Sequence, residues 1–110
     1  MDSDKMQERV DRLVLETWKN KYFGPLCIGL QLTEEAGEVA GAINRAFGDQ
    51  VKKTEDDHAS IKTEVGDVMF ALCCLANSLG FTLEECFEKN MKKLGERDSD
   101  RHERIEEKKS

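Results

Sequence analysis

Two pairs of acidic residues are the part of the chain whose types and spacing could do chemistry. Glu35 and Glu38 lie in the stretch LTEEAGEVAGAI, and Glu64 and Asp67 lie in TEVGDVMF. Because residues three apart share one side of a helix, each pair would form one acidic patch. If the two helices pack side by side, four carboxylates converge without His or Cys. That ligand set suits a hard cation such as Mg²⁺ or Mn²⁺, which also binds substrate phosphates.

The helical positions of these acids separate them from ordinary surface glutamates. Glu35 would lie at the edge of the apolar stripe of its helix, whereas Glu34 would lie almost opposite the core and be solvated. Asp67 would share its side of the helix with Phe70 and Cys74. An unpaired carboxylate in apolar surroundings is unfavourable, so a cation is expected nearby. Spacing alone leaves a solvated acidic surface as the alternative, because the chain contains 23 acidic residues.

A glycine stands between the two acids of each pair, at Gly37 and Gly66. Glycine in a helix interior is destabilising by about 1 kcal/mol relative to alanine. Two glycines at matched places therefore predict either a close approach of the helices or room for a ligand.

The hydrophobic pattern predicts the helices that would carry these residues. Apolar residues recur at steps of three and four with no β-type alternation, so we expect an all-α bundle of four main helices, in which the second and third pack antiparallel. Pro25 suits the first turn of the second helix and Gly48 its end. Thr82 and Glu85 predict a capping box at the start of the fourth helix. The expected elements are helices at 4–20, 25–47 and 56–79, a fourth helix after residue 82, and a charged tail at 98–110 that can be helical in part.

The third helix contains VMFALCCLA, which is apolar on every side from residue 68 to 76. A helix apolar all round must be covered all round. Residues 1–97 form one small domain, so we expect the second cover to come from another subunit of a homo-oligomer, a dimer or a tetramer. We also expect the cysteines to be buried and chemically inert; they are Cys27, Cys73, Cys74 and Cys86.

Composition and charge exclude several classes of function. The chain has 110 residues, a net charge of −6 and a pI near 5.0, so it offers no basic surface for a nucleic-acid polymer. No apolar run is long enough to predict a membrane span. The polar, acidic start MDSDKMQERV is unlike a secretory signal, which predicts a cytoplasmic protein.

The order and spacing of the acidic pairs resemble a known signature. ExxE as EAGE, then residues 39–63, then ExxD as EVGD is similar to the motif of the MazG-like nucleoside triphosphate pyrophosphohydrolases, in the all-α NTP pyrophosphatase superfamily. The likeness extends over 23–97. It implies a helical bundle that works as an oligomer, and Mg²⁺, with Mn²⁺ as a substitute, held by Glu35, Glu38, Glu64 and Asp67.

The resemblance also implies a reaction. An NTP or dNTP would be cleaved between the α and β phosphates to a monophosphate and pyrophosphate, in keeping with nucleotide-pool house-cleaning. The stretch NMKKLGERD resembles the nucleotide-binding element, which points to Asn90, Lys93 and Arg97 as substrate-binding residues. A carboxylate not fully used as a ligand could orient the attacking water, a role we assign to Glu38 first and Glu35 second.

Other interpretations remain open at this point. One is a different reaction of the same superfamily, on dUTP or phosphoribosyl-ATP, and another is a non-enzymatic helical oligomerisation module. The aromatic residues Trp18, Tyr22 and Phe23 could stack on a base, but we expect Trp18 to pack in the core.

Overall fold

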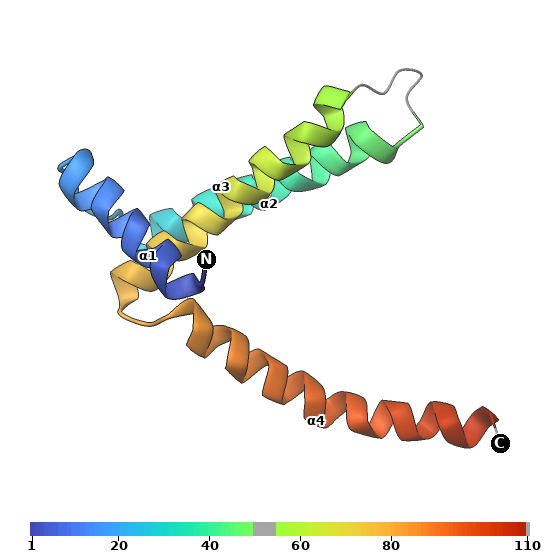
Figure 1. Cartoon of the computed structure of the whole chain (residues 1–110). Helices are drawn as coiled ribbons and strands as arrows, with labels where there is room; N and C mark the ends of the chain where they lie inside the picture. Colours follow the sequence, from blue (N-terminus) through green and yellow to red (C-terminus); the bar gives the residue numbers. More distant parts are fainter. Residues whose placement is uncertain (50–54, 110) are drawn as a thin grey trace.

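Helices make up nearly all of the chain that the structure describes (Figure 1). The computed structural model describes residues 1–49 and 55–109, with side chains described at 1–49 and 59–97. No strand occurs within those residues, so the all-α prediction is confirmed. The elements are α1 (Ser3–Asp11), the π-helical turn η1 (Arg12–Thr17), α2 (Pro25–Phe47), α3 (Glu55–Leu79) and α4 (Leu83–Lys109).

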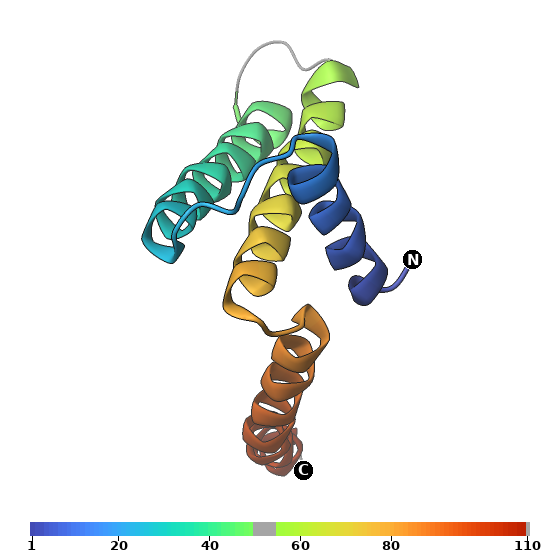
Figure 2. The same cartoon turned by 90° about the vertical axis from the view of Figure 1, so that its left-hand side faces the viewer.

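The helices α2 and α3 lie side by side and run in opposite directions (Figures 1 and 2). Pro25 occupies the first turn of α2 behind the N-cap Gly24, and the N–H of Gly48 closes the other end by donating to the carbonyl of Asn44. The pair shares a core of mostly small residues, and this packing confirms the predicted antiparallel hairpin. The buried residues of the two helices are Ile28, Ala42, Ala46, Ala71, Cys73 and Ala76.

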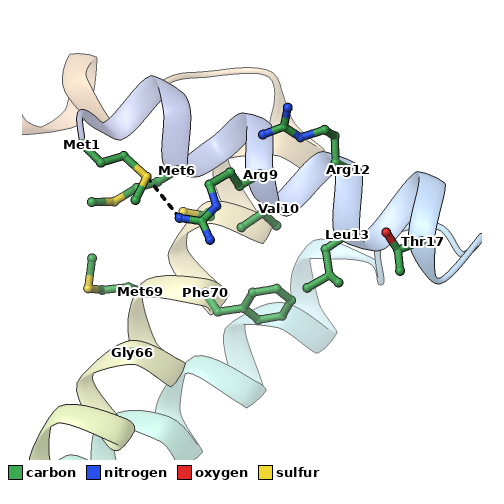
Figure 3. A pocket seen from close by; sticks show the side chains of 11 residues that line it. Met1, Met6, Arg9, Val10, Arg12, Leu13, Thr17, Gly66, Met69 and Phe70 are labelled. Atoms are coloured by element: carbon green, nitrogen blue, oxygen red, sulfur yellow. Dashed lines mark hydrogen bonds between the residues drawn. The ribbon is translucent and has the colours of Figure 1, made fainter.

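The first helix, α1, packs on α3 and covers part of the apolar stretch 68–76 (Figures 2 and 3). Between α1, η1 and α3 lies an open pocket of about 700 Å³, lined by Met6, Leu13, Met69 and other residues. We expected another subunit to supply this second cover. Within the single chain α1 supplies much of it, although Met69 remains 41% exposed.

The end of the first helical segment differs from the expected helix 4–20. The α-helix ends at Asp11, a wider π-helical turn follows, and the helix stops at Thr17. The N–H of Trp18 donates to the carbonyl of Leu13 across this turn, and Lys19 adopts the left-handed backbone conformation at φ 51°. A non-glycine residue in that region is uncommon, and here it directs the chain out of the helix.

The start of α4 has the capping box that the sequence predicts. The N–H of Glu85 donates to Thr82 Oγ1 at 3.1 Å, and the N–H of Thr82 donates to a Glu85 carboxylate oxygen at 3.4 Å. From Gly80, at φ 79°, the chain turns sharply, so α4 leaves the α2–α3 pair (Figure 1). Among the described residues α4 contacts α1 and α3 but not α2.

Helix α4 continues to Lys109, through the segment we expected to form a charged tail. The division into a domain at 1–97 and a tail at 98–110 stays a prediction, because no helix end marks it. Taken singly, no helix of the described residues is long and apolar enough to cross a membrane. Two helical segments, Ala59–Leu79 and Leu83–Arg97, reach that length and apolar composition only when they are counted as one. The chain bends by 103° between them.

The cysteines divide into two kinds, which corrects the expectation that all four are buried. Cys73 is buried and Cys74 half-buried, since both face neighbouring helices from α3. Cys27 and Cys86 are exposed because they lie on faces of α2 and α4 that no other described element covers.

Candidate active site

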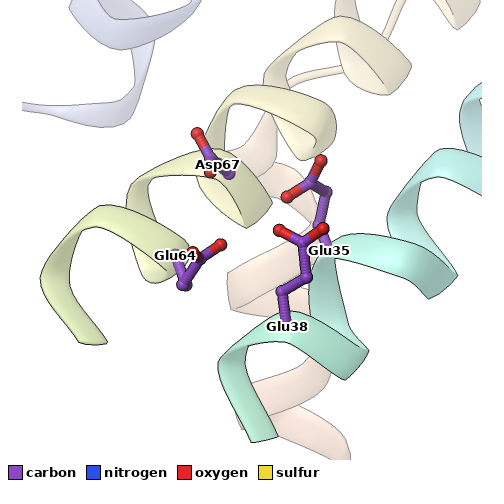
Figure 4. Close-up of side chains that lie close together, drawn as sticks. All are labelled: Glu35, Glu38, Glu64 and Asp67. Carbon is purple, nitrogen blue, oxygen red and sulfur yellow. The ribbon is translucent and has the colours of Figure 1, made fainter. Parts of the chain in front are cut away.

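Four carboxylates meet where α2 and α3 lie side by side (Figure 4). Glu35 and Glu38 project from α2, and Glu64 and Asp67 project from α3. One ligand atom of each residue lies within 4.8 Å of the others. The i,i+3 spacing places each pair on one patch of its helix, and the antiparallel packing brings the patches together. We call this group the carboxylate cluster.

Two carboxylate oxygens of the cluster are buried without a hydrogen-bond donor from the described residues. Glu35 and Glu64 are half-buried, whereas Glu38 and Asp67 are exposed. The Oε2 atoms of Glu35 and Glu64 are buried and have no hydrogen-bond partner among the described residues. A buried acceptor without a partner is unfavourable, so these two oxygens require a cation or a donor that the described part of the chain does not supply.

The pKa shifts of two acids in the cluster also favour a bound cation. Loss of solvation, followed by repulsion from Glu38 and Asp67, raises the pKa of Glu35. A hydrogen bond with Glu38, then loss of solvation and repulsion from the other acids, raises the pKa of Glu64. Both shifts mean that burial and mutual repulsion disfavour the fully ionised cluster. A bound cation would offset both effects.

The residues present fit a hard divalent cation. Oxygens about 2.1 Å from an octahedral Mg²⁺ lie roughly 3.0 to 4.2 Å apart, and the cluster atoms already lie within 4.8 Å of one another. All four donors are carboxylates, the type that Mg²⁺ and Mn²⁺ prefer. The two buried oxygens without partners are the natural first ligands.

A second pocket, of about 210 Å³, lies between η1, the connection that follows it, α2 and α3. Its wall includes Gln31, four residues before Glu35 on α2, and Phe70, three residues after Asp67 on α3. Residues at these spacings share a helix face, so the pocket lies on the same side of the hairpin as the cluster. We call it the aromatic pocket, because its lining includes Trp18, Tyr22, Phe23 and Phe70.

The position of Trp18 corrects the expectation that it packs in the core. Its side chain is 55% exposed and meets Phe70 edge-to-face, with ring centroids 6.0 Å apart. The π-helical turn and the left-handed Lys19 release Trp18 from the helical stripe that the sequence suggested. Gln31 was not among the residues singled out from the sequence, and Phe70 was placed beside Asp67 without a pocket; their spacing from Glu35 and Asp67 was the available signal.

Comparison with known proteins identifies the family. A family model described as the MazG nucleotide pyrophosphohydrolase domain matches residues 23–102. The chain belongs to the MazG nucleotide pyrophosphohydrolase family. As a MazG protein it is a hydrolase that acts on nucleotides, and the non-enzymatic interpretation is thereby set aside.

Two solved structures and one curated sequence resemble this MazG chain. A Bacillus-conserved MazG protein, a nucleotide pyrophosphohydrolase, is 35% identical with a TM-score of 0.71, over 86% of this chain and 90% of that one. The putative pyrophosphatase YPJD from Bacillus subtilis is 41% identical with a TM-score of 0.74, over 84% of this chain and 94% of that one. The uncharacterized protein YpjD of Bacillus subtilis strain 168 is 45% identical over 93% of this chain and 91% of its own length.

The predicted substrate-binding residues of the MazG chain lie apart from the carboxylate cluster. Asn90, Lys93 and Arg97 are exposed on α4, which does not contact α2 within the described residues. A single chain therefore does not bring them to the acids, and their role stays a prediction. Glu34 is exposed and outside the cluster, in agreement with its predicted solvation.

The two glycines of the MazG motif lie in open space. A Cβ atom added at Gly37 or Gly66 would meet no atom within 4 Å. A close approach of α2 and α3 thus does not explain them. Of the two explanations that the sequence allows, room for a ligand is the one that agrees with this open space.

Proposed function

We propose that this MazG protein is a Mg²⁺-dependent nucleoside triphosphate pyrophosphohydrolase. It cleaves an NTP or dNTP between the α and β phosphates and releases a monophosphate and pyrophosphate. The observation that carries the proposal is the convergence of Glu35, Glu38, Glu64 and Asp67, with two of their oxygens buried and unpartnered. Membership of the MazG family supports the reaction class. House-cleaning of the cytoplasmic nucleotide pool is the role we propose.

The four acids divide into two roles by their burial. Glu35 and Glu64 hold the metal through their buried oxygens, and Asp67 completes the ligand set from the exposed side. Bound Mg²⁺ would neutralise phosphate charge, which a phosphoanhydride needs before water can attack it. Glu38 is exposed and close to the other acids, so it is the first candidate to orient the attacking water and accept its proton, with Glu35 second.

The nucleoside part of the substrate fits the aromatic pocket. Ligand pockets commonly measure about 300–1,000 Å³, so a pocket of about 210 Å³ suits one part of a nucleotide rather than the whole. Trp18 and Phe70 offer ring faces or edges to a base, and the Gln31 amide can both donate and accept hydrogen bonds. The phosphates then extend along α2 and α3 toward the cluster.

We also propose that the working enzyme is a homo-oligomer, a dimer or a tetramer. The Cα radius of gyration is 18.5 Å, against about 13 Å for a compact domain of this length. Large apolar side chains are exposed at one end of α2 and along α4, and a second subunit would cover them. They are Phe23 (63% exposed), Leu26 (80%), Leu30 (65%), Phe87 (61%) and Met91 (47%).

An oligomer would also bring positive charge to the substrate. Four carboxylates repel a polyanion, and a metal ion offsets only part of their charge. Because Lys93 and Arg97 lie away from the cluster of their own chain, we propose that they, with Asn90, contact the triphosphate bound by a neighbouring subunit. Helix α4 of one chain would then complete the site that α2 and α3 of a neighbouring chain form.

Product analysis in isotopically labelled water tests the reaction. A panel of standard and damaged NTPs and dNTPs, with dUTP and phosphoribosyl-ATP included, is incubated with the enzyme and Mg²⁺. We expect pyrophosphate, and we expect the label in the monophosphate because water attacks the α-phosphorus. Orthophosphate with a nucleoside diphosphate would show a γ-phosphatase instead, and the proposal would be wrong.

A further inference from the structure

A chain of hydrogen bonds joins α1, the connection after η1, α3 and the start of α4. Gln7 is buried, and its Nε2 donates to Asn77 Oδ1 at 2.9 Å and to the carbonyl of Phe81 at 3.1 Å. Its Oε1 accepts from the N–H of Leu83 at 2.8 Å. A glutamine with this many partners is well satisfied, and it fixes α1 to the turn that begins α4.

The same chain of bonds reaches the wall of the aromatic pocket. Asn77 Nδ2 donates to the Tyr22 hydroxyl at 2.9 Å and to the carbonyl of Gln7 at 3.0 Å. The Tyr22 hydroxyl in turn donates to the carboxylate of Asp11. Tyr22 thus lines the aromatic pocket, and its hydroxyl lies in a junction formed by Gln7, Asp11 and Asn77.

The segment that this junction holds has few other bonds to the helices: near its start, the N–H of Asn20 donates to the carbonyl of Val14 at 2.9 Å. Residues 19–24 are outside any helix, and Lys19 has a left-handed backbone. Yet the segment supplies Asn20, Lys21 and Phe23 to the aromatic pocket, and Trp18 precedes it directly. A segment without regular secondary structure keeps one conformation only where tertiary bonds hold it. The bonds of the Tyr22 hydroxyl are the ones that tie the middle of this segment to two helices.

We propose that Tyr22 and Asn77 are positioning residues for the nucleoside: they hold Trp18 and the segment 19–24 in place as a wall of the pocket that receives the base. The inference rests on the proposed function, because it takes the aromatic pocket as the base site. It adds that affinity for the base depends on a hydrogen-bonded junction that touches neither the metal ligands nor the phosphates.

Tyr22→Phe isolates the positioning role, because it keeps the ring in the pocket and removes only the hydroxyl. We expect KM for the preferred nucleoside triphosphate to rise about three- to tenfold, the factor that corresponds to one hydrogen bond, with kcat within twofold of the wild type. Inhibition by inorganic tripolyphosphate, which has no base, should not change. Asn77→Asp removes the amide that donates to the Tyr22 hydroxyl and to the carbonyl of Gln7, and it should act in the same direction.

Ser78→Ala is the matched control. Ser78 follows Asn77 on α3, and among the described residues its hydroxyl donates to the carbonyl of Leu75 at 3.3 Å and not to the junction, so its loss should leave KM unchanged. An unchanged KM in Tyr22→Phe would overturn the inference. A parallel loss of kcat, of nucleotide affinity and of tripolyphosphate inhibition would also overturn it, because that pattern indicates a merely structural role.

Fluorescence separates this inference from the proposed reaction. Trp18 is the only tryptophan of the chain and lines the same pocket, so binding of a nucleoside monophosphate should change its emission. If the wild type hydrolyses no triphosphate, the proposed function fails, but this titration still measures base binding. Weaker binding to Tyr22→Phe than to the wild type then supports the inference, and equal binding, or no binding to either, contradicts it.

Discussion

Glu35 of α2 and Glu64 of α3 belong to one carboxylate cluster, and each has an Oε2 atom that is buried without a hydrogen-bond partner in the described part of the chain. Two such oxygens on facing helices are unfavourable in the protein alone, because burial and mutual repulsion both oppose their charge. The same arrangement is favourable once a divalent cation lies between the helices. The cluster therefore lowers the stability of the metal-free protein at the place where the proposed chemistry needs negative charge.

Glu38→Gln should separate activity from stability. We expect turnover to fall at least about a hundredfold, since the candidate base for the attacking water is lost. The metal-free protein should be as stable as the wild type or slightly more so, because one charge leaves a repulsive cluster. Steady-state kinetics and thermal unfolding measure the two effects. Glu34→Gln, on the same helix but exposed and outside the cluster, is the control that should leave turnover unchanged.

Mg²⁺ should stabilise the folded protein. A ligand that binds only the folded state adds about 2.7 kcal/mol to the free energy of unfolding at a hundred times its Kd. The midpoint of thermal unfolding should rise with Mg²⁺ or Mn²⁺ and return with a chelator, and activity should follow it. Glu64→Gln should lose most of this response. A wild-type protein whose unfolding ignores both ions would speak against a metal site in the cluster.

Lys93→Ala should weaken binding of the triphosphate more than binding of the nucleoside. A lost charged hydrogen bond to phosphate accounts for about 1.5–3 kcal/mol of binding free energy, and Arg97→Ala should have a smaller effect. Inhibition constants for the triphosphate and the nucleoside give the comparison.

Mixing variants tests whether Lys93 acts on a neighbouring subunit. Oligomers assembled from Lys93→Ala and Glu38→Gln chains would contain some sites with an intact Lys93 and an intact Glu38. We expect partial recovery of activity in the mixture, when neither variant alone is active at low substrate concentration. If the mixture is no more active than the sum of its parts, each site is built from one chain.

Titration of Tyr22 should report the junction directly, because it is the only tyrosine of the chain. Burial and the hydrogen bond to Asp11 raise the pKa of Tyr22 from 10.0 to about 12. Since the folded value is the higher one, the contribution of the neutral phenol to stability is complete below about pH 10 and is lost as the pH rises toward 12. Phenolate absorbance against pH gives the value. Asp11→Asn should lower it, and a folded wild type that titrates near its ordinary value would contradict the junction.

The sequence by itself determined the features that depend on helical periodicity. Glu35 with Glu38, and Glu64 with Asp67, share helix faces because a spacing of three residues fixes their direction. The two helices are adjacent in sequence and apolar along one side, so their antiparallel packing could be predicted as well. The carboxylate cluster could therefore be predicted from the order of the residues, and the family resemblance rested on the same pattern.

Only the tertiary structure decided where α4 points and where Trp18 lies. The start of α4 and the segment after Lys19 are both held by hydrogen bonds between distant residues. Gln7 and Asn77, for example, are 70 positions apart. Periodicity describes the neighbours of a residue along its own helix, but it carries no information on which side chain from another segment will accept its hydrogen bond. For that reason the aromatic pocket, the Tyr22 junction and the separation of Lys93 from the acids came from the fold alone.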